Sequence, residues 1–311
     1  MSTANNCDLK RLEFHPLTIS DQEAVRSVTL AAGRRNCSFT FANLVGWQFR
    51  FNTEVCVCHD VVLLRFDLNG HRAYMLCMKG SPDVRLIELL CADAASCQSD
   101  LLLMGLEDTV ASRLLELFPD KASVEPRRNQ YDYIYLRQEL AEVKGKKLKA
   151  KRNHINKFLA DHPDYVYKEL SEDCFEECLR LTKRWGNAVC LEFPSYAESV
   201  KAEQTCMERV MSHWGDLHMV GGCVYAEGRM VAFSYGSAVT NDTFDVCVEK
   251  ADRSVDGAFS IINQQFASHL PGQFVYVNRE EDMGLEGLRK AKLSYHPHLL
   301  LSYNNVLISC N

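Results

Sequence analysis

The chain has 311 residues, of which 47% are hydrophobic and 24% are charged, and its formal net charge is −6. This length favours two domains of about 100–200 residues each, and the acidic balance argues against a wide phosphate-binding surface. The N-terminus lacks the apolar segment of a signal peptide, and no apolar run approaches the ~18–20 residues that span a bilayer. We therefore expect a cytoplasmic protein without stable membrane association.

In chain order, the first half predicts a strand, two helices, three strands, a helix, a strand, a helix and a strand. The corresponding segments are 12–19, 20–33, 39–51, 54–60, 61–68, 71–79, 83–95, 101–106, 107–119 and 131–137. Asn69–Gly70, between two of these strands, is typical of a hairpin turn.

The stretch that follows, 137–163, is polar and rich in Lys and Arg, and it predicts a long helix with Gly145 as a possible break. The second half then predicts the order of the first half again. Its segments are 165–170, 171–185, a helix from Pro194, three strands within 217–250, a helix over 258–270, strand 273–278, a short helix over 283–291 and a strand over 299–307.

The order β-α-α-β-β-β-α-β-α-β thus occurs twice, which predicts a duplicated α/β (α+β) fold with a mixed central sheet in each unit. The alternative is two unrelated α/β domains. The expected boundaries are 1–137 for an architectural N-terminal domain, 138–163 for a basic linking helix and 164–311 for a C-terminal domain with the active site.

The 14 cysteines show no C-x-x-C pair and no ladder of fixed spacings. Most lie among apolar residues, as in the run VCVC at 55–58. We interpret them as small buried hydrophobic residues in a reducing compartment, and we expect neither a metal site nor structural disulfides.

Segment 245–259 places Asp245, Cys247 and Glu249 on one face of a strand that leads through a loop into a helix near Gly257. The free N–H groups at a helix start form an anion site, so this loop predicts a phosphate-binding site; the alternative is a helix start capped by Asp252 or Asp256. Glu249 is a candidate general base, or else one half of a salt bridge to Lys250 or Arg253.

Segment 278–282, NREED, follows an apolar strand. Asn278 and Glu280 share one face and Arg279 the other, while Asp282 is placed to cap the next helix. Capping does not explain the other charges, so we interpret the segment as the rim of an active site, with a solvated turn as the alternative.

The basic segment 144–157 contains Lys147, Lys151, Arg152 and His154. This density suits contacts with nucleic-acid or substrate phosphates. A solvated helix face is the other explanation for a run of charge, and His154 is either catalytic or a structural hydrogen-bonding residue.

The strings EKADRSVDGAF, NREEDMGLEGLRKAKLSYHP and KGKKLKAKRNHINKF, together with the element order, resemble the GNAT acyltransferase fold and, over essentially the whole chain, the DUF2156 family. That family shares the C-terminal domain of phosphatidylglycerol lysyltransferase and is related to the Fem-type aminoacyl transferases. The large membrane domain of the lysyltransferases is missing here.

The resemblance implies roles for single residues. The Fem segment G-L-x-x-F-K-x-x-F aligns with Gly287, Leu288, Ala291, Lys292 and Tyr295, so Lys292 is expected to face a phosphate. The GNAT pyrophosphate loop R-x-x-G-x-G/A falls on Arg253, Asp256 and Ala258, with its glycine displaced to Gly257. The residues expected to bind a cofactor are Lys250, Arg253, Ser254, Val255, Asp256, Gly257, Ala258, Arg279 and Lys292.

The expected catalytic residues are Glu249, Asn278, Glu280 and Tyr235. Tyrosines protonate the leaving thiolate in many GNAT enzymes, and both Tyr235 and Tyr295 are open candidates; packing is the alternative for Tyr295.

These observations predict an acyl- or aminoacyl-transferase that moves an activated acyl group from acyl-CoA or aminoacyl-tRNA directly to an amine. Coenzyme A is the possible cofactor, and no metal is expected. The alternative is a non-catalytic protein that binds a nucleotide-like ligand or tRNA through a degenerate GNAT fold. The amine acceptor and the oligomeric state stay open.

Overall fold

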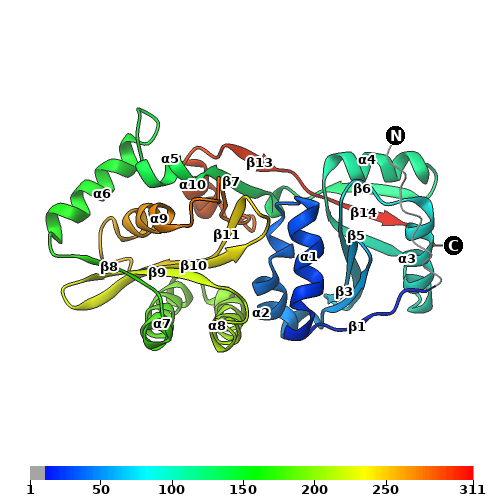
Figure 1. Cartoon of the computed structure of the whole chain (residues 1–311), viewed down its shortest axis with the longest axis horizontal. Coiled ribbons are helices and arrows are strands. Elements are labelled where there is room, and N and C mark those ends of the chain that lie inside the picture. Colours follow the sequence, from blue (N-terminus) through cyan, green and yellow to red (C-terminus); the bar gives the residue numbers. More distant parts are fainter. Residues whose placement is uncertain (1–10, 311) are drawn as a thin grey trace.

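A computed structural model describes residues 11–310, so Cys7 lies outside the described residues. It contains two seven-stranded mixed sheets side by side, each covered by helices on both faces (Figure 1). The first unit is built from β1 (His15–Pro16), α1 (Gln22–Ala32), α2 (Phe41–Phe51), β2 (Glu54–Cys58), β3 (Val61–Leu68), β4 (His71–Met78), α3 (Val84–Ser96), β5 (Leu101–Leu106), α4 (Asp108–Leu117) and β6 (Ala122–Pro126).

The second unit repeats this order. It is built from β8 (Val166–Glu169), α7 (Phe175–Glu192), α8 (Ala197–Ser212), β9 (Val220–Ala226), β10 (Arg229–Ala238), β11 (Thr243–Ala251), α9 (Ala258–His269), β12 (Tyr276–Asn278), α10 (Glu286–Leu293) and β13 (Leu299–Leu301). The predicted duplication of a mixed-sheet fold is therefore confirmed.

Local sequence explains many of these elements. The β3–β4 hairpin turns at Asn69 and Gly70, which both have positive φ (51° and 82°), as a type I′ turn requires. Helix α3 begins where the side chain of Asp83 accepts a hydrogen bond from the amide of Leu86 at 2.8 Å.

Each sheet contains one strand from the other half of the chain. β7 (Asp132–Leu136) lies between β12 and β13 of the second sheet, and β14 (Asn304–Ile308) lies between β5 and β6 of the first. Figure 1 shows β14 running from the second unit into the first. The sheets therefore do not separate at residue 137, and the expectation that segment 131–137 completes the first sheet is wrong.

The predicted final strand, 299–307, is in fact two strands in two different sheets. The first-unit strand β6 was not predicted. Alternation along a strand indicates which residues face the core, but it does not indicate the neighbouring strand, so the exchange was invisible in the sequence.

The predicted long helix over 137–163 is two helices, α5 (Arg137–Glu142) and α6 (Lys149–Asp161). Val143 and Gly145 between them have left-handed φ values of 48° and 84°. The break at Gly145 is thus confirmed. Both helices lie on one face of the second sheet, beside α9.

Three hydrophobic clusters hold the fold together. One fills the space between the first sheet and α3 and α4, and another lies between the second sheet and α5, α6 and α9. The third joins the two units, because α1 and α2 of the first unit pack in one core with α7 and α8 of the second. The surfaces that face each other between the units are therefore fixed by apolar packing.

Candidate active site

Strands β11 and β12 run parallel and then part. They pair over only three residues, from Thr243 opposite Tyr276 to Asp245 opposite Asn278, after which β11 continues to Ala251 and β12 ends. Neighbouring β10 carries a bulge at Gly236, where an added Cβ would lie 1.7 Å from the carbonyl oxygen of Asp245. The chain that leaves β12 therefore turns away from β11 at residue 278.

The NREED segment begins at this point, and its side chains go alternately to two places. Asn278 and Glu280 point toward the first unit, where they bond Asp132 and Asn43, while Arg279 points toward β11. Asn278 and Asp282 are fully buried, so the segment is not a solvated turn. Glu280 has a left-handed φ of 57°, a strained conformation for a residue with a side chain.

An ion pair fills the space where β11 and β12 part. A terminal nitrogen of Arg279 donates to Glu249 Oε1 at 2.8 Å, and both side chains are 12% exposed. Asn263 on α9 donates to the other carboxylate oxygen at 3.1 Å. Burial disfavours the charge of Arg279, but the Glu249 carboxylate outweighs it and raises the pKa of the guanidinium.

Two buried polar atoms beside this ion pair have no hydrogen-bond partner. One is the donor Nη1 of Arg279 and the other is the acceptor Oδ1 of Asn263. Because buried polar groups are nearly always hydrogen-bonded, such a donor and acceptor at one place indicate room for a ligand group that supplies both partners.

Aromatic rings and a lysine border the same place. The Arg279 guanidinium carbon lies 4.8 Å from the ring centroid of Tyr295, and Lys151 Nζ lies 4.3 Å from that centroid. Burial, followed by the nearby Arg279, lowers the pKa of Lys151. Tyr295 is buried with both cations close to its ring, and its pKa is raised by burial.

A cavity of about 340 Å³ lies at the start of α9. It is lined by Lys151, His154, Asp252, Arg253, Val255, Asp256, Gly257, Ala258, Phe259 and Ser260. The predicted anion-binding loop and two residues of the basic segment therefore share one cavity, although they are about 100 residues apart in the sequence.

Hydrogen bonds and ion pairs hold this loop at Asp252 and at Asp256. Asp252 accepts from the amide of Ser254 at 3.0 Å and from Arg229 at 2.6 Å, while Asp256 pairs with Lys157 and with His154. Gly257 packs closely against α6, because an added Cβ would lie 2.4 Å from the carbonyl oxygen of His154. Its φ of 82° requires a glycine as well.

The remaining basic residues lie in different surroundings. Arg152 donates to the carbonyl oxygens of Val143 and Gly145 at 2.7 and 3.1 Å, which holds the α5–α6 turn. Lys147 lines a second cavity, of about 560 Å³, between the α5–α6 turn and the stretch 272–275. Of the predicted phosphate-contacting residues, Lys151 and His154 therefore line one cavity, Lys147 lines the other and Arg152 lines neither.

Lys250 and Lys292, both expected to bind a cofactor, have partners within the protein. Lys250 bonds Glu203 at 2.8 Å and lies 3.6 Å from the ring centroid of Trp185. Lys292 is 8% exposed and donates to the carbonyl oxygens of Arg279, Glu280 and Glu281. Neither lysine lines the cavity at α9, and Glu249 pairs with neither Lys250 nor Arg253, which bonds Glu192 instead.

Tyr235 is 1% exposed and packs against Trp214 and Phe233 in the core that joins the units. Burial, followed by nearby Cys206, raises its pKa well above the usual range. This surrounding indicates packing, and the catalytic role expected for Tyr235 stays a prediction that the geometry does not support.

Asp282 does not cap α10 as predicted. The helix begins at Glu286, because Met283 and Gly284 take left-handed φ values of 53° and 79°. Asp282 is instead the centre of a buried ion-pair network, in which Arg289 donates two bonds at 2.8 and 2.9 Å and Arg128 one at 2.9 Å. These partners outweigh burial and lower the pKa of Asp282.

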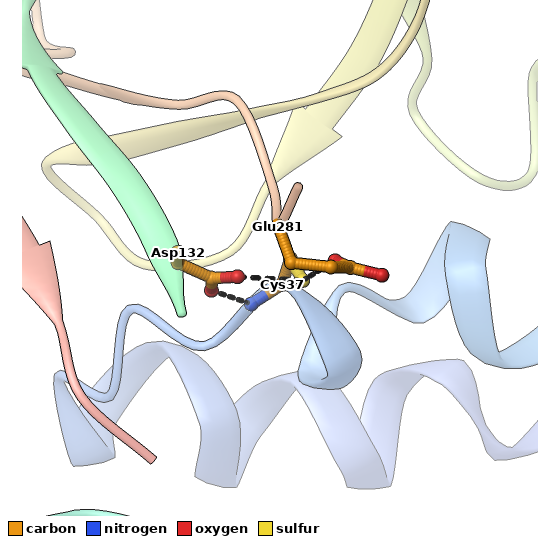
Figure 2. Close-up of side chains that lie close together, drawn as sticks. All are labelled: Cys37, Asp132 and Glu281. Carbon is orange, nitrogen blue, oxygen red and sulfur yellow. Dashed lines mark hydrogen bonds between the residues drawn. The ribbon is translucent and has the colours of Figure 1, made fainter. Parts of the chain in front are cut away.

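A cluster of acids and thiols lies where the two units meet. We call it the inter-unit cluster, and its members are Cys37, Asp132, Asp245, Cys247, Glu280 and Glu281. Figure 2 shows three of them: the Cys37 thiol lies 3.2 Å from Asp132 Oδ1 and 3.6 Å from Glu281 Oε2. The members come from the loop after α1, from β7, from β11 and from the NREED segment.

The partners of these carboxylates are mostly neutral. Asn43 on α2 donates to Asp245 at 3.2 Å and to Glu280 at 2.8 Å, and Asn278 donates to Asp132 at 2.8 Å. Burial, followed by Glu281, raises the pKa of Asp132 to about 6, and burial raises those of Asp245 and Glu280 well above their usual range.

Sequence reasoning missed Cys37, Asn43, Asp132 and Asn263. A single acid inside the apolar strand DYIYL was a signal for Asp132, because a strand buried on both faces seldom carries a lone carboxylate. Nothing in the local sequence marked the others, since their role depends on the packing of α2 and α9 against β11 and β12.

Comparison with known proteins identifies the family. Residues 31–304 match the family described as phosphatidylglycerol lysyltransferase, C-terminal. The chain belongs to this family. The predicted resemblance is thereby confirmed over most of the chain.

Solved structures agree with this assignment. A conserved protein of unknown function from Bacteroides thetaiotaomicron is 35% identical, with 96% of this chain and 100% of that chain covered and a TM-score of 0.90. The C-terminal DUF2156 domain of a candidate lysylphosphatidylglycerol synthetase from Agrobacterium fabrum is 11% identical, with 92% of each chain covered and a TM-score of 0.63.

Two further structures show the fold alone. A tandem GNAT protein from the clavulanic acid biosynthesis pathway is 11% identical, covering 97% of this chain and 99% of its own, with a TM-score of 0.51. FemX is 9% identical, covering 94% and 97%, with a TM-score of 0.52. The tandem GNAT-like fold expected from the element order is therefore confirmed.

An uncharacterised protein of Mycoplasmoides gallisepticum is 22% identical over 198 residues. The match spans 63% of this chain and 62% of that protein. Among residues 11–310, no helix is long and apolar enough to cross a membrane.

Proposed function

We propose that this chain is an acyltransferase that moves an activated acyl group onto an amine at the place where β11 and β12 part. The family and the tandem GNAT-like fold support acyl transfer as the class of reaction. The observation that carries the proposal is the pair of unsatisfied buried atoms, the donor on Arg279 and the acceptor on Asn263.

The carbonyl oxygen of an acyl donor needs a hydrogen-bond donor, and the attacking amine needs a hydrogen-bond acceptor. Arg279 Nη1 would donate to the acyl carbonyl oxygen and stabilise the negative charge that develops on it, while Asn263 Oδ1 would accept a hydrogen from the attacking amine. Glu249 lies between them and is the candidate base that takes the amine proton. Transfer would be direct, because holding both reactants in place supplies much of the rate enhancement without a covalent intermediate.

The phosphate groups of the donor would lie in the cavity at the start of α9. Lys151 and Arg253 supply positive charge there, and the helix start favours an anion. Acyl-CoA and aminoacyl-tRNA both carry phosphate groups, and both stay candidate donors. The buried thiols of Cys37, Cys77, Cys178 and Cys223 are not oxidised to disulfides, which suits a reaction in the reducing cytoplasm.

The first experiment is thermal unfolding with CoA, acetyl-CoA, charged tRNA and uncharged tRNA. A ligand at ~100 times its dissociation constant adds about 2.7 kcal/mol, which raises the melting temperature by a few degrees. We expect a shift with one donor class that falls in Lys151→Gln, which lines the cavity, and persists in Lys149→Gln on the same helix. No shift with any donor would contradict the proposed donor site.

The second candidate is a binding protein without turnover, and one observation favours it: Glu249 already pairs with Arg279 and is mostly buried. Glu249→Gln separates the two. Release of free thiol from acetyl-CoA, or of uncharged tRNA from its charged form, is measured with a panel of primary amines. The enzyme should lose turnover in this variant and keep donor binding, whereas a binding protein shows no turnover in either form.

A further inference from the structure

We propose that the inter-unit cluster binds a divalent transition-metal cation, with Asp245, Cys247 and Glu280 as its ligands. One ligand atom from each of these residues lies within 4.8 Å of the other two. The same holds for the neighbouring set formed by Cys37, Asp132 and Glu281. This site would be separate from the donor site, and its existence does not depend on the proposed function.

The charge of the cluster is the first argument. Asp132 and Asp245 are fully buried, and Glu280 and Glu281 lie beside them. Within residues 11–310, no Lys or Arg side chain forms an ion pair with any of the four; the nearby Lys292 donates to backbone carbonyl oxygens instead. Buried charges are normally paired or bind metals. The Lys292 ammonium lies close enough to attract Glu280 and Glu281, but it is one cation beside four carboxyl groups, and it forms a direct ion pair with none of them within the described residues.

The spacing of the donor atoms is the second argument. A tetrahedral zinc ion with bonds of about 2.3 Å to sulfur and 2.0 Å to oxygen sets these atoms about 3.5 Å apart. Cys247 Sγ lies 3.7 Å from Asp245 Oδ2, and in the neighbouring set Cys37 Sγ lies 3.2 and 3.6 Å from its two carboxylates. The thiol–carboxylate distances therefore match those of a zinc site.

Unsatisfied atoms at the same place are the third argument. Asp245 Oδ1 and Ser237 Oγ are buried and have no hydrogen bond of ordinary geometry. Ser237 lies directly opposite Asp245 in the β10–β11 pair, so both side chains project from the same face of the sheet. Thr40 lies near the same carboxylate, and its buried hydroxyl has no hydrogen-bond partner. A metal ion with a bound water supplies partners for a free carboxylate oxygen and for nearby hydroxyls.

The donor set indicates which cation. Mg²⁺ and Ca²⁺ prefer oxygen ligands alone, whereas a thiolate with two carboxylates suits Zn²⁺ and its transition-metal neighbours. Binding would convert the Cys247 thiol to a thiolate and release its proton to solvent.

The test uses the full chain. The protein is dialysed against chelator, loaded with Zn²⁺ and analysed for bound metal by mass spectrometry; Co²⁺ is loaded in parallel, because a cobalt–thiolate bond has its own absorption band. We expect about one equivalent of zinc per chain to survive dialysis, and a cobalt band in the wild type.

Cys247→Ser should abolish the cobalt band and Asp245→Asn should weaken zinc binding at least tenfold. Cys206→Ser is the control, because Cys206 is a buried thiol of the apolar core that joins the units and belongs to neither set of candidate ligands. If Cys247→Ser does not fold, Asp245→Asn and the wild-type stoichiometry still decide. Absence of bound zinc in the wild type overturns the proposal, as does a cobalt band that is lost in Cys37→Ser and kept in Cys247→Ser.

Discussion

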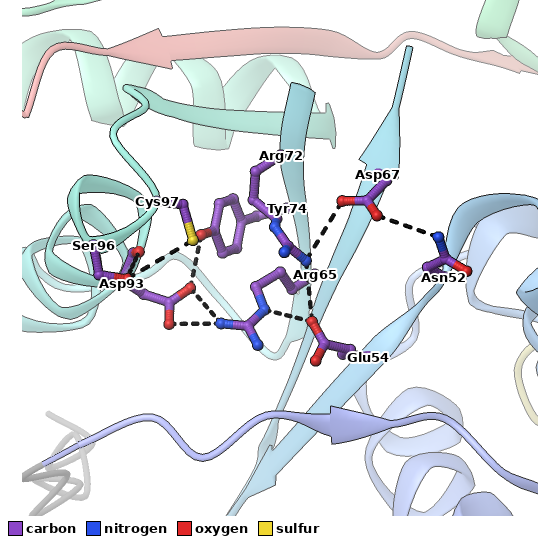
Figure 3. Close-up of polar contacts among 9 residues, drawn as sticks. All are labelled: Asn52, Glu54, Arg65, Asp67, Arg72, Tyr74, Asp93, Ser96 and Cys97. Atoms are coloured by element: carbon purple, nitrogen blue, oxygen red, sulfur yellow. Dashed lines mark hydrogen bonds and ion pairs between the residues drawn. The ribbon is translucent and has the colours of Figure 1, made fainter. Parts of the chain in front are cut away.

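Two groups of carboxylates in the interior of this molecule have different kinds of partner. One group is paired with arginine side chains, and the other is bonded mainly by neutral groups. In the first sheet, Arg65 donates to Glu54 at 2.8 Å and to Asp93 at 2.8 Å, and Tyr74 donates to Asp93 at 2.7 Å (Figure 3). Burial disfavours the charge of Arg65, yet its two carboxylate partners outweigh burial and raise the pKa of its guanidinium.

The inter-unit cluster holds more carboxylates but has thiols and side-chain amides as partners. Figure 2 shows one such thiol, that of Cys37, beside Asp132 and Glu281. The Arg65 network therefore behaves as a structural ion-pair group, whereas the inter-unit cluster breaks the ordinary rule that buried charges are paired. Such violations concentrate at functional sites, where the fold tolerates a local cost.

The largest loss of stability should come from removing Arg65, the cation that pairs with the carboxylates of the first group. Arg65→Ala leaves Glu54 and Asp93 without their main partner, and because the three side chains are only 16–23% exposed we expect a loss of about 2–4 kcal/mol. Urea unfolding measures it. Arg113→Ala, which breaks an exposed pair with Glu116, should cost under about 1 kcal/mol. Equal losses in the two variants would contradict the comparison.

Next in size is the loss of the ammonium beside the inter-unit cluster. Lys292→Met leaves three backbone carbonyl oxygens of the NREED segment without their donor, so we expect a loss of about 2–3 kcal/mol. Lys290→Met, on the same helix but exposed and paired only with Glu286, should change the stability by less than about 0.5 kcal/mol. Unfolding of both variants in urea makes the comparison, and a small effect for Lys292→Met would show that these bonds do not hold the segment.

A smaller effect of opposite sign is expected inside the cluster. With chelator present, Asp245→Asn removes a buried carboxylate that lacks a cationic partner, and we expect the protein to gain about 1 kcal/mol. Asp93→Asn, in the Arg65 network, should lose stability instead, because a paired charge is removed. Melting temperatures measured side by side decide this. If Asp245→Asn destabilises the protein as much as Asp93→Asn does, then the inter-unit cluster does not differ from the Arg65 network in how its carboxylates are stabilised.

The smallest expected effect is a change of stability with pH that arises from Asp252, a carboxylate with strong hydrogen-bond partners. Burial opposes its charge, but bonds from Ser254 and Arg229 outweigh burial and lower its pKa to about 2. Because the pKa is lower in the folded protein than the ~3.9 of an unfolded chain, this carboxylate stabilises the fold above pH ~4 and ceases to do so as the pH falls toward 2. The difference in melting temperature between wild type and Asp252→Asn should therefore shrink over this interval. A difference that does not change between pH 5 and pH 2 would contradict the assignment.

Much of the fold could be predicted from local patterns. The strands at 61–68 and 71–79 and the helix beginning at Asp83 were placed almost as they occur, because alternation, a turn dipeptide and a cap each act over a few residues. The start of α10 was misplaced, since left-handed Met283 and Gly284 give no clear signal in the sequence.

For the candidate site, the sequence indicated the anion-binding loop and the NREED segment, because charged residues directly after apolar strands are unusual without a function. It did not indicate the partners. The alternative to a general-base role for Glu249 was a salt bridge to Lys250 or Arg253, its neighbours in the chain, and its partner is instead Arg279. Contacts between residues 30 or more apart depend on how strands are ordered, and periodicity carries no information about that order.

The sequence by itself thus determined the order of the elements, the duplication and the family, because these depend on short-range patterns and on motifs. Only the tertiary structure decided that β7 and β14 change places between the sheets. That exchange brings Asp132 from the first half beside Asn278 from the second, with Cys37 in contact. The inter-unit cluster exists for this reason, since apolar packing between the units holds together side chains that no local pattern connects.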